Sequence, residues 1–308
     1  MTDTLSVEHL TVRLPVADNA IVHAASDVSL TVAAGTVTAL VGESGCGKSI
    51  LAAAIMGMLP DDAHVAGSIT IKAADTTIEV LPGSGTRLGF RGRVAALIPQ
   101  SPLTSLTPVR TARSQLQETI DSLGGVHSCN DLAARVDLAP SALDRYPHEL
   151  SGGMAQRVAI AAAIAGDPAV IIADEPTAHL DRELTDHTFA LLRDLADTGA
   201  AVLLITHDLA ALERTPVTDT LAIMYASRIM ETGPTPDILA DPLHDYTADL
   251  LNALPARGLH PIPGTPPTLT NLPPECVYHL RRPYTEHSGG PTHMVTIGNR
   301  AFRTRKEH

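Results

Sequence analysis

The 308-residue chain has few cysteines, no long apolar run and fewer basic than acidic residues. Its three cysteines, Cys46, Cys129 and Cys276, are scattered, so they provide neither a disulfide framework nor a cluster of metal ligands, and we expect a reducing, cytoplasmic location. The longest apolar runs, such as residues 51–59, fall well short of the roughly 20 residues that span a bilayer. We therefore expect no transmembrane helix.

The charge balance and the first residues argue against a nucleic-acid-binding protein and a secreted protein. Lys and Arg number 22 against 34 Asp and Glu, which gives a net charge of −12 and disfavours a dedicated nucleic-acid binder, although a local basic patch is compatible with it. Residues 1–4 are polar, with no basic and apolar regions of a secretory signal, so we expect none. The length suggests one large domain plus an appendage, or two domains.

A glycine-rich stretch at residues 42–49 has the spacing of a phosphate-binding loop. It follows a β-type apolar segment, 37–41, and precedes a helix-type segment, 48–58. Glycines let backbone N–H groups turn toward phosphate oxygens, the lysine reaches the β/γ-phosphates, and the serine hydroxyl ligates Mg²⁺. A chance glycine-rich turn with this spacing arises on the order of once in a hundred such chains. The predicted phosphate-binding residues are Gly42, Glu43, Ser44, Gly45, Cys46, Gly47, Lys48 and Ser49.

Two apolar strands end in polar side chains. Residues 169–173 lead into Asp174 and Glu175, and residues 201–205 lead toward His207. Carboxylates at the end of a core strand lie beside the nucleotide in phosphate-loop proteins, so Asp174 is expected to organise Mg²⁺ and Glu175 to accept a proton from water. An acidic turn and a structural histidine are the alternatives. The amphipathic stretch 182–198 suits a right-handed crossover helix between the two strands.

The remaining pattern predicts short strands, a helical region and a proline-rich end. Ser151 occupies an N-cap position, so Gly152 and Gly153 would open a helix with free N–H groups, although Ser-Gly-Gly alone is a common loop sequence. Beyond Pro255 prolines crowd a loop-rich segment. Further strands are expected at 5–14, 27–32, 67–71, 76–81, 94–98, 220–225 and 228–231, and helical stretches at 114–143, 158–165 and 235–254.

Taken together, these motifs resemble the ATP-binding subunits of ABC transporters over roughly residues 5–255. The matching elements are Walker A at 42–49, a Q-loop at Gln100, the signature at 150–154, Walker B ending at Asp174-Glu175, a D-loop at 179–181 and a switch at His207. A narrower resemblance is to the dipeptide, oligopeptide and nickel importer ATPases. It is carried by Met154 after Ser-Gly-Gly and by residues 101–108, 242–247 and 261–267.

The resemblance implies an α/β fold. We expect a P-loop NTPase (RecA-like) core with an antiparallel β subdomain and an α-helical signature subdomain at about 101–165. A nucleotide-binding domain would cover 1–255 and a short Pro-rich C-terminal extension 256–308.

It also implies an ATPase that couples ATP hydrolysis to import of peptides or of nickel or other metal complexes, at the cytoplasmic face of the membrane. The expected partners are integral membrane permease subunits and a second ABC ATPase, a paralogue or a second copy, in a head-to-tail dimer. An extracytoplasmic solute-binding protein would act indirectly, and no nucleic acid is expected. A soluble ABC ATPase not coupled to transport and an exporter ATPase are the alternatives.

The family assigns roles to individual residues. Glu175 would polarise water, His207 would contact the γ-phosphate, and Lys48 would bind phosphate. The implied Mg²⁺ ligands are Ser49, Gln100 and Asp174. The residues expected to cover nucleotide held by a partner subunit are Ser151, Gly152 and Gly153, with Asp181 nearby.

Two departures from the family pattern lead to further expectations. Many members bind an iron–sulfur cluster through several cysteines of the extension, but here only Cys276 is present, and Arg281-Arg282-Pro283-Tyr284 carries Arg where the pattern places Cys. One thiolate does not hold a cluster that takes four, so no cluster is expected. Residues 19–22 also lack the aromatic that many relatives stack on adenine. Looser base recognition should follow.

Overall fold

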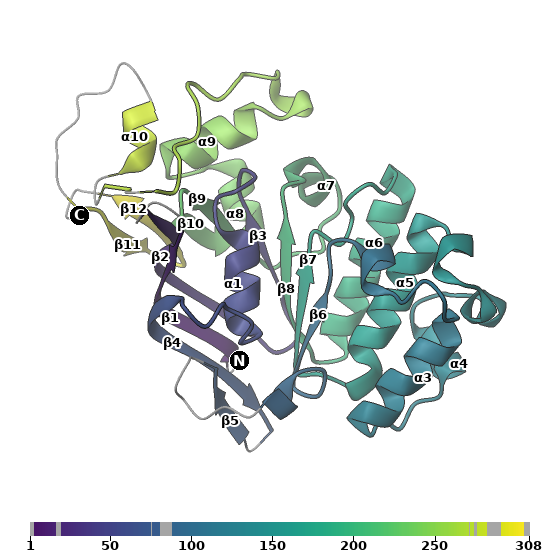
Figure 1. Cartoon of the computed structure of the whole chain (residues 1–308). Coiled ribbons are helices and arrows are strands. Elements are labelled where there is room, and N and C mark those ends of the chain that lie inside the picture. Colours follow the sequence, from purple (N-terminus) through teal and green to yellow (C-terminus); the bar gives the residue numbers. More distant parts are fainter. Residues whose placement is uncertain are drawn as a thin grey trace.

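The structure is a computed structural model that describes residues 3–16, 20–74, 76–80, 88–270, 272–273, 276–281 and 291–304. Two sheets and a lateral group of helices make up the fold (Figure 1). The smaller sheet is antiparallel, with the strand order β2-β1-β4-β5. Its strands are β1 Asp3–Pro15, β2 Ile21–Ala33, β4 His64–Ala73 and β5 Thr76–Glu79.

Within the described part of the chain, the larger sheet has eight strands in the order β11-β12-β10-β9-β3-β8-β7-β6. Strands β9, β3, β8, β7 and β6 are parallel, and β10, β12 and β11 continue the sheet with antiparallel pairing. Every residue of β3 and β8 is buried, which explains their continuous apolar sequences. The strands are β3 Val37–Val41, β6 Ala95–Ile98, β7 Val170–Asp174, β8 Ala201–Thr206, β9 Thr220–Tyr225, β10 Arg228–Pro234, β11 His293–Ile297 and β12 Arg300–Thr304.

Helices cover the two faces of the large sheet. Helix α1, Lys48–Ile55, lies between the two sheets, and its Leu51 and Ile55 belong to the same buried cluster as Leu5 of β1 and Ile205 of β8 (Figure 1). The other face carries α6, Arg182–Asp197. The lateral helical group lies beside the sheet next to β6 (Figure 1) and comprises α2 Pro102–Ser105, α3 Ala112–Leu123, α4 Cys129–Arg135 and α5 Gly152–Ala163. The remaining helices are α7 Leu209–Arg214, α8 Thr235–Ala240, α9 Asp245–Asn252 and α10 Val277–Arg281.

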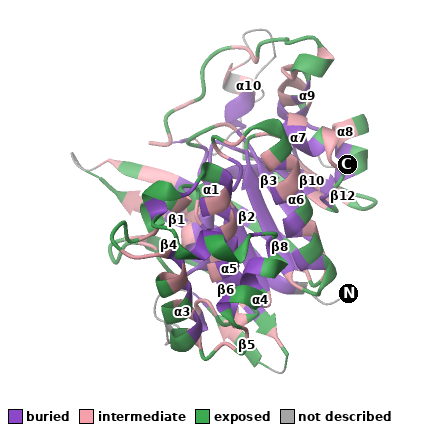
Figure 2. Cartoon of the chain, turned by 90° about the vertical axis from the view of Figure 1, so that its right-hand side faces the viewer, coloured by how far each residue is buried: buried purple, intermediate pink, exposed green. Residues whose placement is uncertain are grey.

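This arrangement confirms the predicted fold class. The parallel core, the antiparallel β sheet and the α-helical group are all present, and Figure 2 shows the buried strands of the core enclosed by partly exposed helices. The strand and helix predicted around residues 42–49 correspond to β3 and α1. The alternation in β1 is interrupted at His9, which has a φ of 50° between Val7 and Leu10. This irregularity keeps both Val7 and Leu10 buried although three positions separate them.

The segment after Pro255 contains more regular structure than its prolines predict. Helix α10 contributes Val277 and Tyr278 to the main core cluster, and the β11–β12 hairpin pairs with β10 through Glu231↔Phe302. The sequence-based boundary near residue 255 stays a prediction. Among the described residues, no helix has the length and apolar character needed to cross a bilayer.

Candidate nucleotide-binding site

The register of the parallel sheet brings four sequence-predicted segments to one edge. Val41 pairs with Thr206, Asp174 pairs with Ile205, and Ile98 pairs with Ala173. The carboxyl ends of β3, β8, β7 and β6 therefore coincide, although these strands are far apart in the sequence. Ligands of open α/β sheets bind outside such strand ends, so this edge is the candidate site.

The phosphate loop has a tightly enclosed backbone. Gly47 has a φ of 112°, and a Cβ placed there would lie 2.2 Å from the carbonyl oxygen of Ala24. At Gly42 a Cβ would lie 2.1 Å from the carbonyl oxygen of Met224. These contacts come from β2 and β9, so the neighbouring strands permit only glycine at both positions. The loop then leads directly into α1, whose N-terminal N–H groups have no partners within the helix.

Lys48 lies folded against the loop. Its side chain is buried, and Nζ donates hydrogen bonds to the carbonyl oxygens of Gly42 at 2.8 Å and Glu43 at 3.1 Å. These carbonyls hold a buried ammonium group beside the loop's N–H donors. Such a charge compensates anionic ligands, which is what a phosphate site needs.

Ser49 and Asp174 come together although 125 positions separate them. The Ser49 hydroxyl donates to Oδ1 of Asp174 at 3.3 Å. Burial raises the pKa of Asp174, the hydrogen bond from Ser49 opposes that shift, and the nearby Glu175 adds to it. A hydroxyl and a carboxylate are the oxygen ligands that Mg²⁺ takes when substrate phosphates complete its coordination, so the pair fits the predicted ion. Among the described residues no three His, Cys, Asp or Glu side chains gather as an independent metal site.

Glu175 and His207 form a pair at the ends of β7 and β8. Nδ1 of His207 lies 2.6 Å from Oε2 of Glu175. The Glu175 side chain is 11% exposed and that of His207 is 66% exposed, so the carboxylate is sheltered while the imidazole extends outward. When Glu175 is ionised its carboxylate only accepts hydrogen bonds, so this contact then uses a proton on Nδ1 of His207. Glu175 also has a φ of 48°, an uncommon conformation for a residue other than glycine.

Gln100 occupies the corresponding position after β6 and is exposed. The segment that follows it leads into the helical group through α2, where Leu103 is 46% exposed. The stretch between α2 and α3 carries Val109, which is 79% exposed. A cavity of about 460 Å³ opens between this segment, β6 and helices α3 and α5, and Leu97 and Leu116 are among its lining residues. The structure thus places the predicted Q-loop between the strand ends and an apolar hollow.

The predicted signature residues lie at a different helix N-terminus. Ser151 caps α5 by accepting a hydrogen bond from Met154 N at 3.3 Å, as the sequence predicts. Ser151 and Gly152 are exposed, and a Cβ at Gly152 would contact Leu180 of the D-loop. Asp181 caps α6 by accepting from Leu184 N at 2.9 Å. The described contacts of these residues lie within α5, α6 and the predicted D-loop, and do not include residues 42–49.

The structure adds three residues that the motifs did not predict for this site. Arg281 of α10 forms an ion pair with Glu43 of the phosphate loop, and the hydroxyl of Tyr246 in α9 accepts a hydrogen bond from Glu43 N at 3.3 Å. Tyr225, the last residue of β9, has its ring beneath the Arg281 guanidinium. The sequence contained one signal, since Arg281 belongs to the segment that departs from the family's cysteine pattern. Nothing in that pattern predicts its partner 238 positions away.

The surroundings of Cys276 do not fit an iron–sulfur cluster. Cys276 is 1% exposed, and its Sγ lies 4.0 Å from Nε2 of His244. Burial opposes ionisation of the thiol, but hydrogen bonds from His244 and His279 outweigh it and lower the pKa of Cys276 to about 5. The nearby Arg281 uses its guanidinium to bind Glu43. Residues 282–284 lie outside the described part of the chain, and the absence of a cluster stays a prediction.

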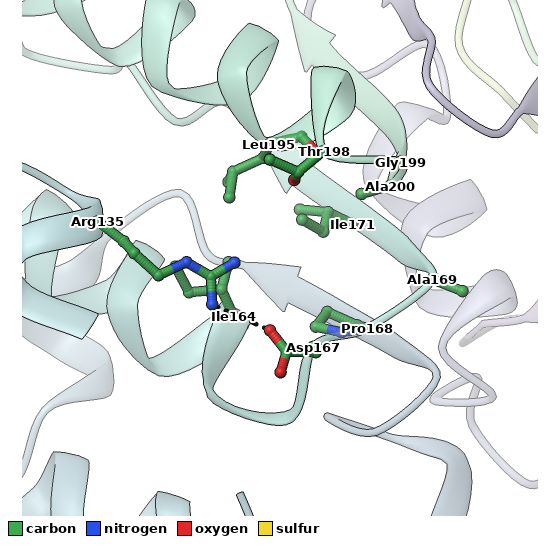
Figure 3. Close-up of a pocket in the computed structure, with 10 residues that line it drawn as sticks. All are labelled: Arg135, Ile164, Asp167, Pro168, Ala169, Ile171, Leu195, Thr198, Gly199 and Ala200. Carbon is green, nitrogen blue, oxygen red and sulfur yellow. Dashed lines mark hydrogen bonds and ion pairs between the residues drawn. The ribbon is translucent and has the colours of Figure 1, made fainter. Parts of the chain in front are cut away.

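Another cavity, of about 430 Å³, lies where β7 and β8 begin (Figure 3). Arg135 at the end of α4 donates to Asp167 at 2.9 Å, and His127 lies 2.7 Å from the same carboxylate. These contacts join the helical group to the base of the large sheet. Since this is the edge opposite the phosphate loop, we interpret the cavity as a structural seam between subdomains.

The fold and the arrangement of this edge define a phosphate-loop ATPase class, and comparison with known proteins identifies the family. The ABC transporter family model matches residues 25–178, and the model described as the C-terminal region of oligopeptide/dipeptide transporters matches residues 230–288. The chain belongs to the ATP-binding proteins of the ABC transporter family and is an ATPase of that family.

Individual relatives support this assignment. The chain is 39% identical to the probable D,D-dipeptide transport ATP-binding protein DdpD of Escherichia coli, over 85% of this chain and 84% of that protein. It is 38% identical to the oligopeptide transport ATP-binding protein OppD of Mycobacterium bovis, over 85% of this chain and 45% of that protein. A dimeric ATP-binding cassette solved with ADP and Pi is similar in fold, with a TM-score of 0.61 and 24% identity over 75% of this chain and 98% of that chain.

Proposed function

We propose that the chain is the ATP-hydrolysing subunit of an ABC importer for peptides. The observation that carries the ATPase site is the Glu175–His207 pair, with atoms 2.6 Å apart, on the same sheet edge as the buried ammonium of Lys48. The importer assignment is supported by the match to the oligopeptide/dipeptide C-terminal region over residues 230–288. The names of the two relatives mention peptides and not nickel, so peptides are the favoured solute class.

In the proposed reaction, ATP binds with its phosphates against the N–H groups of residues 42–49. Lys48 exchanges its loop carbonyls for phosphate oxygens, which compensates their negative charge. Mg²⁺, when bound by Ser49, Asp174 and Gln100, would neutralise charge on the phosphates. Glu175 takes a proton from the attacking water, and the exposed edge of His207 contacts the γ-phosphate while Nδ1 holds the Glu175 carboxylate in place.

The site requires a second subunit. Ser151 and Gly152, at the N-terminus of α5, are exposed, and their described contacts do not include this chain's own phosphate loop. In a head-to-tail dimer each Ser-Gly-Gly would cover the nucleotide held by the other subunit, with Asp181 near the junction. Whether that second subunit is a paralogue or another copy, each chain contributes parts of two sites.

The ATPase proposal is tested by Glu175→Gln, which removes the proton acceptor but keeps the size of the side chain. We expect the hydrolysis rate to fall by at least about 10²-fold, because general-base catalysis contributes on that scale. Binding of a fluorescent ATP analogue should persist, and size-exclusion chromatography in Mg·ATP should show a trapped dimer. Glu8→Gln, the same substitution on β1 of the antiparallel sheet, is the matched control. Wild-type hydrolysis by Glu175→Gln would remove Glu175 from the role of base.

The partners are proposed to be integral membrane permeases that contact the segment after Gln100. That segment exposes Leu103 and Val109, and its Ser105 and Leu106 line the cavity between α3 and α5. Exposed apolar side chains next to a hollow suit a protein partner, and Gln100 links them to the strand ends. Affinity purification of the tagged chain in mild detergent should recover polytopic membrane proteins. Recovery of ribosomes instead would favour the soluble alternative.

A further inference from the structure

Arg281 is a buried junction between the C-terminal segment and the phosphate loop. Its side chain is 5% exposed, and Nη1 and Nη2 lie 2.7 Å and 3.3 Å from the two carboxylate oxygens of Glu43. Nε donates to the carbonyl oxygen of Pro263 at 2.5 Å, and Nη2 also approaches that of Gly264 at 3.3 Å. The planar guanidinium therefore joins three separate parts of the chain in a geometry that lysine would not reproduce.

Glu43 is engaged on both sides of the loop. Its carbonyl oxygen accepts a hydrogen bond from Nζ of Lys48 at 3.1 Å, on the side where phosphate is proposed to bind. Its carboxylate and its backbone N–H face the other way, toward Arg281 and the Tyr246 hydroxyl. One residue thus connects the phosphate-binding lysine with α9 and α10.

Three tyrosines make the support behind the loop rigid. Tyr225, Tyr246 and Tyr278 come from β9, α9 and α10, and they pack against one another with ring centroids 4.4 to 5.3 Å apart. All three are at most 2% exposed, and the Arg281 guanidinium carbon lies 5.8 Å from the centre of the Tyr225 ring. Such packing, with a cation over the ring, holds Arg281 in place. These contacts link Glu43 of the loop to α10 through Arg281.

We propose that Arg281 is a positioning residue for the nucleotide site, and that its ion pair with Glu43 couples nucleotide occupancy of the phosphate loop to docking of the C-terminal segment. This coupling rests on the proposed function of residues 42–49. The Arg281 guanidinium also neutralises the Glu43 carboxylate, which would otherwise repel phosphate from the site. By thermodynamic linkage, bound nucleotide must favour docking of the C-terminal segment by the same factor by which the docked segment raises the affinity for nucleotide.

The first test uses the full chain with Mg·ADP as probe. In the wild type, Mg·ADP should slow hydrogen exchange of the backbone amides at 277–281, and Arg281→Gln and Glu43→Gln should abolish this protection.

The second test measures Mg·ADP affinity by calorimetry. Arg281→Gln should weaken Mg·ADP binding by about tenfold, because an unpaired carboxylate is left beside the site. The double variant Glu43→Gln/Arg281→Gln should bind more tightly than Arg281→Gln alone, because that repulsion is removed. Arg281→Lys keeps the charge and should lie between wild type and Arg281→Gln.

Arg257→Gln is the matched control. Arg257 also pairs with a glutamate, Glu213 of α7, at 2.7 Å and also donates to a backbone carbonyl, that of Leu239. It should leave Mg·ADP affinity and the protection at 277–281 unchanged. Equal effects of Arg257→Gln and Arg281→Gln, or wild-type amides at 277–281 that do not respond to Mg·ADP, would overturn the coupling. Failure of the wild type to bind Mg·ADP would instead overturn the proposed function and the coupling with it.

Discussion

The chain has two glycine-rich helix N-termini that differ in what surrounds them. At the start of α1, Gly47 and Lys48 are buried against β2 and β9, and the preceding loop is held by Arg281 and Tyr246. At the start of α5, Ser151 and Gly152 are exposed, Ser151 accepts a hydrogen bond from Met154 N, and a Cβ at Gly152 would meet Leu180 of the predicted D-loop. The first is an enclosed cradle made by one chain, and the second is an open surface.

This difference shows how similar local sequences acquire different tasks. Free N–H groups at a helix N-terminus favour anions in both places, but only α1 is accompanied by a buried ammonium group and two carboxylates. The N-terminus of α5 has the donors without the rest of the site. We infer that its donors act on nucleotide held elsewhere.

The largest effect is expected for Gly42→Ala in the enclosed cradle. The added Cβ would lie 2.1 Å from the carbonyl oxygen of Met224, so the loop must move away from β9. Mg·ADP affinity should fall at least about 100-fold, which corresponds to about 2.7 kcal/mol. A Cβ at Gly45 in the same loop would meet no atom within 4 Å, but Gly45 has a φ of 78°. Gly45→Ala should therefore weaken Mg·ADP binding only by the roughly 1–2 kcal/mol that a left-handed backbone conformation costs an alanine. Equal losses in the two variants would contradict the enclosure argument.

A smaller and more selective effect is expected for Ser151→Ala at the open end. The variant loses a helix cap, so thermal unfolding should show a stability loss of about 1 kcal/mol. ATP hydrolysis should fall about tenfold, because one donor to the partner's nucleotide is lost, while Mg·ADP binding to the isolated chain stays unchanged. Thr111→Ala, which removes the equivalent cap of α3, should lose the same stability but keep the hydrolysis rate. Weaker Mg·ADP binding by Ser151→Ala would place Ser151 in its own chain's site.

The smallest effect is expected for the choice of nucleotide base. Residues 19–22 contain no aromatic residue, so we expect no stacking on the base from this segment, an interaction worth about 1–3 kcal/mol. The kcat/KM values for GTP and ATP should agree within about threefold. Ile21→Tyr, at a position that is 41% exposed, should improve kcat/KM for both nucleotides. A strong preference of the wild type for ATP would show that other residues select the base.

Local sequence was sufficient for the elements that depend on near neighbours. The strand, glycine loop and helix at 37–55, the Ser151 cap and the apolar strands ending at Asp174 and Thr206 follow from residue type and spacing, and the structure has them at these places. The phosphate-loop pattern predicted nucleotide binding, and the family comparison confirms the ATPase assignment. Residue-by-residue roles at this edge stay predictions.

Only the tertiary structure decided which distant residues meet. Parallel pairing brings Asp174 to Ser49 and places Glu175 beside His207, and sheet register is not encoded in any single segment. The prolines after 255 predicted an appendage, but packing of Tyr278 and pairing of β12 with β10 return that segment to the core. The Arg281–Glu43 contact depends on this return. The sequence by itself thus determined the two glycine-rich helix N-termini, because they depend on neighbouring residues. Long-range packing determined that the N-terminus of α1 is enclosed and that of α5 is exposed.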